Sequence, residues 1–262
     1  MIGSDDKLPF TIHLEELRNR LIKCFIAVGV GFVGSFGFKE KLFDILVQPL
    51  MKVMEAGDNL IFTALPEAFF TYLKVSFLAG IMLSSPIILY QFWMFVAPGL
   101  YVKERRMLIP IVVLSSFFFI GGSLFGYFMV FPLGFKFFLS FATETIRPLP
   151  SMKEYLGFSA KLLLAFGLVF ELPLVLTFLA RLGVVSVSFL KKNRKYALLI
   201  FFVGAAILTP PDVITQILMA VPLMILYEIS IIGARIFGKK KSGETTTEKD
   251  KEGADDSESD AT

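Results

Sequence analysis

Carboxylates and arginines gather at two places beside long apolar stretches, and these residues are the best suited to bind a charged ligand. Glu16 lies near Arg18 and Arg20 in the segment that precedes the first apolar stretch. Glu104 lies beside Arg105 in the short turn after the second stretch. A carboxylate binds a guanidinium through two parallel charge-assisted hydrogen bonds, which a lysine ammonium cannot reproduce. The two carboxylates could therefore bind two arginines, although a solvated helix face and a basic turn explain the same composition.

Three further residues stand at unusual places in the apolar pattern. Glu171 interrupts a long apolar stretch, where an ionisable side chain is costly and usually faces a water-filled groove or a polar partner. Its structural alternative is a carboxyl group hydrogen-bonded to a neighbouring span. Asp212 follows two prolines and is either a helix cap or a functional residue. Pro49 is most simply a turn or a kink in the first outer loop.

Motifs for nucleotide hydrolysis, zinc binding and nucleophilic catalysis are missing from the sequence. It has no P-loop, no paired histidines and no Gly-x-Ser-x-Gly elbow, and its one histidine is His13. The one cysteine, Cys24, rules out an internal disulfide and a cysteine-built metal site. We therefore expect no enzyme, no metal and no cofactor. The net charge of +3 does not indicate nucleic-acid binding, because the Lys and Arg residues flank apolar stretches.

The apolar stretches predict an all-α integral membrane protein. Of the 262 residues, 55% are hydrophobic and 19% are charged, and several uncharged stretches are long enough to span hydrocarbon. We expect a cytoplasmic amphipathic segment (1–20), a membrane domain (21–237) and a disordered acidic tail (238–262). The six expected spans are 21–38, 75–97, 107–135, 156–180, 196–209 and 213–234. The last two are expected to be short, and the loop from Lys39 to Ala68 is expected to contain an interfacial helix.

The distribution of positive charge predicts the orientation of these spans. Sixteen Lys and Arg residues fall on the side of both termini, whereas five are spread over the longer opposite loops. Positive residues are enriched in cytoplasmic loops, so both ends of the chain are expected in the cytoplasm. The break at Thr209-Pro210-Pro211-Asp212 makes the number of crossings even, because two prolines end one helix before another begins.

Four ordered motifs, covering the chain to about residue 237, resemble the TatC family of twin-arginine translocase subunits. They are His13-Leu14-Glu15-Glu16-Leu17-Arg18-Asn19-Arg20, Phe92 to Tyr101 with Glu104-Arg105-Arg106, Phe170-Glu171-Leu172-Pro173, and Leu208-Thr209-Pro210-Pro211-Asp212. The resemblance implies a six-span protein of the bacterial cytoplasmic membrane. Such a subunit binds the twin-arginine signal peptide of folded precursor proteins and recruits single-span TatB-like and TatA-like subunits. Transport is then driven by the protonmotive force, within a receptor complex that contains more than one copy.

The resemblance also implies roles for individual residues. Glu16 and Glu104 correspond to the acidic contacts for the arginine pair. Glu171 corresponds to the polar residue that meets a partner helix, and Pro49 and Asp212 correspond to outer-loop positions tied to activity. The residues implied around the arginine-binding contacts are Arg18, Arg20, Phe95 and Arg105.

Two other functions are compatible with a polar residue inside an apolar stretch. A proton-coupled transporter of small solutes could use Glu171 as its proton site, but such proteins often show repeat symmetry, which this sequence lacks. An intramembrane enzyme would need a nucleophile paired with a base within the spans, and no such pair is visible.

Overall fold

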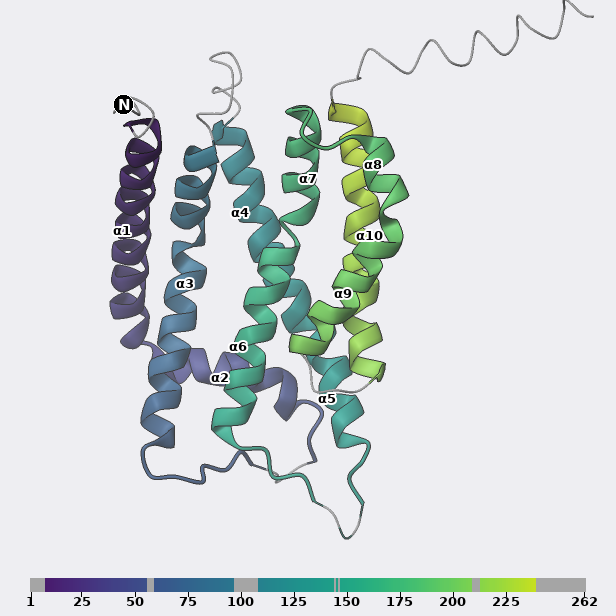
Figure 1. The fold of residues 1–262 in the computed structure, drawn as a ribbon. Coiled ribbons are helices and arrows are strands. Elements are labelled where there is room, and N and C mark those ends of the chain that lie inside the picture. Colours follow the sequence, from purple (N-terminus) through teal and green to yellow (C-terminus); the bar gives the residue numbers. More distant parts are fainter. Residues whose placement is uncertain are drawn as a thin grey trace, which may run out of the picture.

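The computed structural model describes residues 8–55, 59–96, 108–143, 145, 147–208 and 213–238, and these form an all-helical bundle (Figure 1). Glu104, Arg105, Asp212 and nearly all of the predicted acidic tail lie outside the described residues. In chain order the helices are α1 (Leu8–Phe36), α2 (Lys39–Met51), α3 (Glu67–Val96), α4 (Leu108–Phe125), the π-helix η3 (Gly126–Val130), α5 (Phe131–Leu139), α6 (Met152–Val169), α7 (Leu172–Arg181), α8 (Val187–Lys192), α9 (Arg194–Leu208) and α10 (Val213–Phe237).

Five helical segments of the described chain are long and apolar enough to cross a membrane. They are His13–Phe36, Glu67–Val96, Ile109–Leu139, Met152–Arg181 and Val213–Phe237. The fifth expected span, 196–209, corresponds to α9, whose 15 residues extend roughly 22 Å at 1.5 Å per residue, less than the ~30 Å of a bilayer core. The short fifth span that the sequence predicts is therefore present as a helix.

The prediction of a short sixth span is wrong. α10 has 25 residues and extends roughly 37 Å, which is enough to cross a bilayer core. The uncharged run ends before Glu228, but the helix continues to Phe237, and Arg194 of α9 donates a hydrogen bond from Nη2 to Glu228 Oε2 at 2.7 Å. Pairing with a cation lowers the cost of a carboxylate near the end of an apolar helix.

Other boundaries show how local sequence shapes the helices. α1 is continuous from Leu8, so the amphipathic segment and the first span form one helix. The fourth span is divided between α6 and α7 at Phe170 and Glu171, next to Pro173. A proline in the first turn of a helix is tolerated because its missing N–H would have no partner there. The polar residue therefore sits at a break between two helices.

α2 lies across the base of the long helices in Figure 1, at the end of the bundle opposite the N-terminus. It buries Leu46, Val47 and Leu50 and exposes its opposite face. The amphipathic helix expected in the loop from Lys39 to Ala68 is thus confirmed. Its buried residues join a core that includes Phe131 and Leu156 from the long helices.

α1 packs on α3 through small residues. A Cβ atom on Gly31 would lie 2.8 Å from the carbonyl oxygen of Gly80, and one on Gly80 would lie 2.6 Å from the amide nitrogen of Phe32. Ser84 Oγ also donates a hydrogen bond to the Ala27 carbonyl at 2.8 Å. Close backbone approach at small residues, with a hydroxyl bridging the pair, is how helices associate within lipid.

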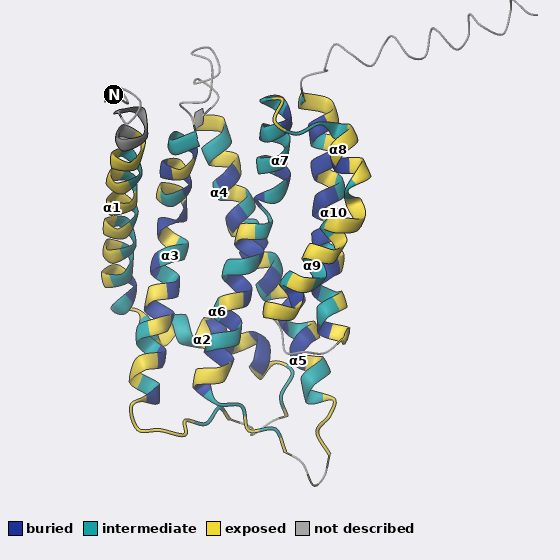
Figure 2. Ribbon diagram, in the orientation of Figure 1, coloured by how far each residue is buried: buried dark blue, intermediate teal, exposed yellow. Residues whose placement is uncertain are grey.

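The outer surface of the bundle is strongly apolar. Figure 2 shows α1 mostly exposed, while buried residues run through α3, α4, α6 and α10. Val30, Phe117 and Ile207 are among many large apolar side chains with about seven-tenths of their surface exposed. A soluble monomer rarely exposes apolar patches of this extent, so this surface fits a lipid environment.

Candidate functional site

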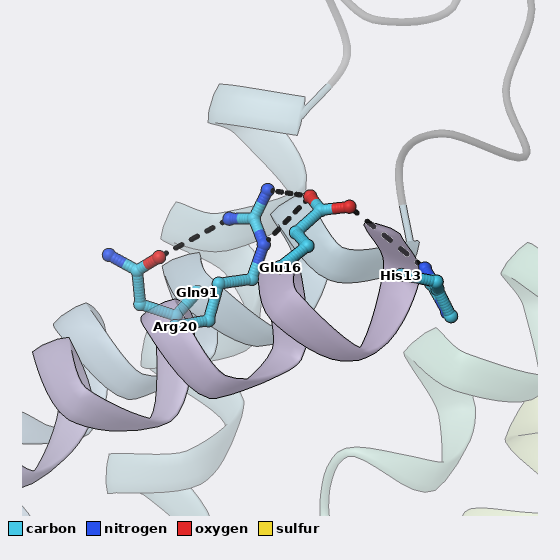
Figure 3. A network of polar contacts seen from close by, with 4 residues as sticks. All are labelled: His13, Glu16, Arg20 and Gln91. Atoms are coloured by element: carbon cyan, nitrogen blue, oxygen red, sulfur yellow. Dashed lines mark hydrogen bonds and ion pairs between the residues drawn. The ribbon is translucent and has the colours of Figure 1, made fainter. Parts of the chain in front are cut away.

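The N-terminal end of α1 and the C-terminal end of α3 meet in a polar network (Figure 3). Arg20 donates hydrogen bonds to Glu16 Oε1 from Nε at 3.0 Å and from Nη2 at 2.5 Å. Its third nitrogen, Nη1, donates to Gln91 Oε1 on α3 at 3.3 Å. His13 Nδ1 lies 3.9 Å from Glu16 Oε2. One guanidinium thus links the two helices and holds one oxygen of the Glu16 carboxylate.

An aromatic contact joins the same two helix ends. The rings of His13 on α1 and Phe95 on α3 stack with their centroids 4.4 Å apart and their planes 19° from parallel. Because Phe95 is four residues after Gln91, both side chains project from the same face of α3. The structure therefore brings together three residues that the sequence analysis selected, Glu16, Arg20 and Phe95.

Glu16, Arg20 and Gln91 border a cavity of about 480 Å³ that opens to the outside. Its walls carry both signs of charge, so it could accept a ligand with cationic and polar groups. The lining residues are Glu15, Glu16, Asn19, Arg20, Lys23, Tyr90, Gln91 and Met94. Arg18 is exposed and is not among the residues that line the cavity.

Gln91 is a member of the network that sequence reasoning missed. It is 9% exposed, and it is the residue of α3 to which Arg20 donates. A polar amide within an otherwise apolar stretch, one helical turn before Phe95, was the available signal. The amide was overlooked because it carries no charge.

Glu171 lies in a second polar group, buried between three helices. Trp93 Nε1 of α3 donates to Ser115 Oγ of α4 at 3.0 Å, and Ser115 Oγ donates to Glu171 Oε2 at 2.6 Å. The residue is only 4% exposed, and its other oxygen, Oε1, has no hydrogen-bond partner among the described residues. Unpaired buried polar atoms are rare in folded proteins, which sets Oε1 apart from the other oxygen of this carboxyl group.

Pro49 lies inside α2, where it is buried. The sequence suggested a turn or kink in the outer loop, and the structure places the proline within a helix of 13 residues. Because proline lacks an N–H, the carbonyl four residues earlier loses its helical partner. That carbonyl belongs to Ile45.

Glu67 is a buried carboxylate that the sequence analysis did not single out. It stands at the start of α3, and its two oxygens accept five hydrogen bonds from two separate chain segments. Thr63 and Ala64 donate from the first outer loop, while Ser151 and Lys153 donate from the start of α6. An acidic residue in the first turn of a helix is common, so its link to a distant loop was not readable from the sequence.

Comparison with known proteins assigns the chain to a family. A family model described as Sec-independent protein translocase protein (TatC) matches residues 12–222. The chain belongs to the TatC family. This confirms the resemblance drawn from the four sequence motifs, and the matched range contains the α1 and α3 network, Glu171 and Pro49.

TatC proteins of bacteria match the chain over nearly its whole length. The Sec-independent protein translocase protein TatC of Desulforapulum autotrophicum is 68% identical over 244 residues, which cover 93% of this chain and 90% of that protein. The TatC protein of Escherichia coli strain K12 is 40% identical over 241 residues, covering 92% and 93% of the two chains.

A crystal structure of the twin-arginine translocase receptor TatC has the same fold. It is 43% identical, gives a TM-score of 0.78, and covers 86% of this chain and 99% of its own. The chain is thus a multi-pass membrane component of a bacterial protein translocase, which is a transport protein and does not belong to a catalytic enzyme family.

Proposed function

We propose that this chain is the receptor subunit that binds the twin-arginine signal peptide of folded precursor proteins, at the cavity between α1 and α3. The observation that carries this proposal is the set of contacts that the Glu16 carboxylate makes. Arg20 already binds its Oε1 through two nitrogens, so the carboxylate accepts a guanidinium in this setting. Its Oε2 has only His13 at ion-pair distance among the described residues, and Glu16 lines the cavity. A ligand arginine can bind there.

The second arginine of the ligand is proposed to bind Glu104, with Arg105 beside it. Both residues lie within 97–107, outside the described residues, and this segment follows the end of α3 at Val96 in the sequence. Phe95, stacked on His13, offers an aromatic face at the end of α3, and guanidinium groups stack favourably on such faces. Arg18 and Arg20 are proposed to set the position and charge of Glu16.

We propose that the chain crosses the membrane six times with both termini in the cytoplasm. Figure 1 shows the start of α1 and the end of α10 at the same end of the bundle, as an even number of crossings requires. That end also carries Lys191, Lys192 and Arg235, in keeping with positive cytoplasmic loops. The proposed domains remain 1–20, 21–237 and 238–262, and α9 is the short fifth span.

Glu171 is proposed to receive a polar group of a single-span partner, TatB-like or TatA-like, during assembly for protonmotive-force-driven export. Its free Oε1 supports this role, whereas its burial means that the partner must reach it between helices. Pro49 and Asp212 are proposed as outer-loop residues needed for activity. A receptor complex with several copies of this chain in the bacterial cytoplasmic membrane completes the proposal.

The receptor proposal is tested by binding of an Arg-Arg signal peptide to the purified protein. Glu16→Ala and Glu104→Ala should each weaken binding about tenfold, because a hydrogen bond to a charged group contributes about 1.5–3 kcal/mol and Glu16 is partly solvated. Glu104→Asp should be milder than Glu104→Lys, and peptide Arg-to-Lys changes should also cost affinity. Glu154→Ala, an exposed acid at the opposite end of the bundle, is the matched control. Unchanged affinity in both alanine variants would contradict the receptor proposal.

The role of Glu171 needs a separate experiment. Site-specific crosslinking to single-span subunits should fall in Glu171→Ala while peptide binding stays within about twofold, because the two sites use different residues. Equal crosslinking in the variant and the native protein would show that Glu171 has only a structural role.

A further inference from the structure

α2 contains a proline at a position that leaves a backbone acceptor free. Pro49 lies near the end of the helix and cannot donate to the carbonyl of Ile45, four residues earlier. A backbone carbonyl that loses its helical partner can accept a hydrogen bond from another donor. Ile45 is 57% exposed, so this donor can be water or a side chain from elsewhere in the chain.

Two tyrosine hydroxyls supply donors to this part of α2. Tyr127 Oη donates to the Ile45 carbonyl and Tyr155 Oη donates to the Leu46 carbonyl, each at 2.5 Å. Tyr127 belongs to the π-helix η3 and Tyr155 belongs to α6. Two consecutive carbonyls of α2 are thus bound by side chains 82 and 109 residues away in the sequence.

The two tyrosines belong to one continuous row of aromatic rings. Tyr127 contacts Phe131 at a centroid distance of 6.0 Å, Phe131 contacts Phe135 at 5.4 Å, and Phe135 contacts Tyr155 at 5.3 Å. Phe131 is 1% exposed and Tyr155 is 5% exposed. Tyr127, at the other end of the row, is half-buried. Close packing of the buried rings limits the movement of the row, which presents both hydroxyls to α2.

α2 forms one wall of an apolar groove of about 510 Å³. Leu42, Ile45 and Leu46 contribute this wall, while α3 and α4 contribute residues such as Val75 and Leu124. Ile45 and Tyr127, the two partners of the hydrogen bond at the proline, both line the groove. A shift of α2 would therefore change the depth of the groove.

We infer that Tyr127 and Tyr155 are positioning residues, which act with Pro49 to clamp α2 against the long helices as a wall of the apolar groove. Pro49 has no N–H to donate to the Ile45 carbonyl, and the Tyr127 hydroxyl donates to that carbonyl. The clamp gives a physical reason for the proposed importance of Pro49 to activity, and in that respect it rests on the proposed function. The arrangement of α2 itself can be measured without an export assay.

The test removes each tyrosine hydroxyl in turn and measures the distance between two spin labels. The labels are attached to cysteines that replace Lys41 of α2 and Lys161 of α6, in a Cys24→Ser background. Both labelled side chains are exposed. Tyr127→Phe and Tyr155→Phe should each broaden the distance distribution at least about twofold, because each keeps the ring and loses one interhelical hydrogen bond. Tyr72→Phe is the matched control, since the Tyr72 ring contacts Phe43 of α2 at 5.7 Å and the substitution preserves that contact.

A second background separates the clamp from general destabilisation. Pro49→Ala restores an N–H for the Ile45 carbonyl, so Tyr127→Phe should broaden the distances less in that background than in the native protein. Tyr155→Phe should broaden the distance distribution equally in the native and the Pro49→Ala backgrounds, because Pro49 does not affect the donor of the Leu46 carbonyl. Unchanged distances in both phenylalanine variants would overturn the clamp, as would an equal effect of Tyr127→Phe in both backgrounds.

Transport measurements distinguish failure of the clamp from failure of the proposed function. Tyr127→Phe should reduce export at least about threefold while signal-peptide binding stays within about twofold of the native protein, since the cavity between α1 and α3 lies at the other end of the bundle. Lost export with an unmoved α2 would overturn the positioning role. If the native protein fails to bind the peptide, the receptor proposal is overturned, whereas the spin-label distances still test the clamp.

Discussion

The contact between Gly31 and Gly80 predicts that one added methyl group will disturb both stability and the receptor cavity. In Gly31→Ala, the new Cβ would lie 2.8 Å from the Gly80 carbonyl oxygen and 2.9 Å from Ser84 Oγ. The serine hydroxyl can rotate away, but the backbone oxygen can move only with its helix. α1 and α3 must therefore separate.

The required movement can be estimated from ordinary contact distances. Ordinary van der Waals contact begins at 3.4 Å, so a contact of 2.8 Å must open by about 0.6 Å. If this opening reaches the end of α1, the 3.3 Å contact between Arg20 and Gln91 lengthens to about 3.9 Å, which is beyond a hydrogen bond. The free-energy cost of such overpacking is about 1–3 kcal/mol.

A neighbouring glycine provides the control for helix propensity. Gly34→Ala lies on the same helix, and its Cβ would meet nothing within 4 Å. Both substitutions gain the same helix preference of alanine over glycine, roughly 0.5–1 kcal/mol, so the difference between them isolates the contact. That difference corresponds to a melting temperature about 2 to 12 °C lower for Gly31→Ala.

Thermal unfolding in detergent and signal-peptide binding are the two measurements. Peptide affinity should fall roughly twofold to tenfold in Gly31→Ala, which is the effect of one hydrogen bond of about 0.5–1.5 kcal/mol. Gly34→Ala should bind like the native protein. Melting temperatures that agree within about 1 °C would refute the tight contact. A large stability loss with unchanged affinity would refute the dependence of the cavity on this part of α1.

Two further predictions concern buried polar groups away from the cavity, and both use neighbouring residues as controls. Ser115→Ala should leave the Trp93 indole N–H without its acceptor and shift its fluorescence, whereas Ser116→Ala, which loses only a bond within its own helix, should not. Glu67→Ala should lower the melting temperature by several degrees, because it removes the acceptor of five hydrogen bonds that join the outer loop to the start of α6, whereas exposed Glu154→Ala should leave it unchanged. An equal response of either variant and its control would contradict the corresponding prediction.

The helical architecture was largely predictable because a membrane span is a property of one segment. Long uncharged stretches, the break next to Pro173 and the amphipathic helix before Leu50 are each encoded within a short range of sequence. The span expected at 213–234 was taken as short, because the uncharged run stops before Glu228. In the structure α10 continues to Phe237, and Glu228 pairs with Arg194 of the neighbouring α9.

The candidate site was also predictable from the sequence only in part. Charge and spacing identified Glu16, Arg20 and Glu171, because ionisable groups stand out against an apolar background. Uncharged partners such as Gln91 and Ser115 did not stand out, since amides and hydroxyls are common within membrane helices. Their roles depend on which helix packs opposite them.

By itself, the sequence determined that the chain is an all-helical membrane protein of the TatC family, with a carboxylate and an arginine poised at the start of its first helix. These features depend on hydropathy, charge and local spacing. Only the tertiary structure decided that Arg20 reaches Gln91 and that Tyr127 takes the carbonyl which Pro49 leaves free. Such contacts join residues 71 and 82 positions apart, and their geometry is set by close helix packing, which no local pattern encodes.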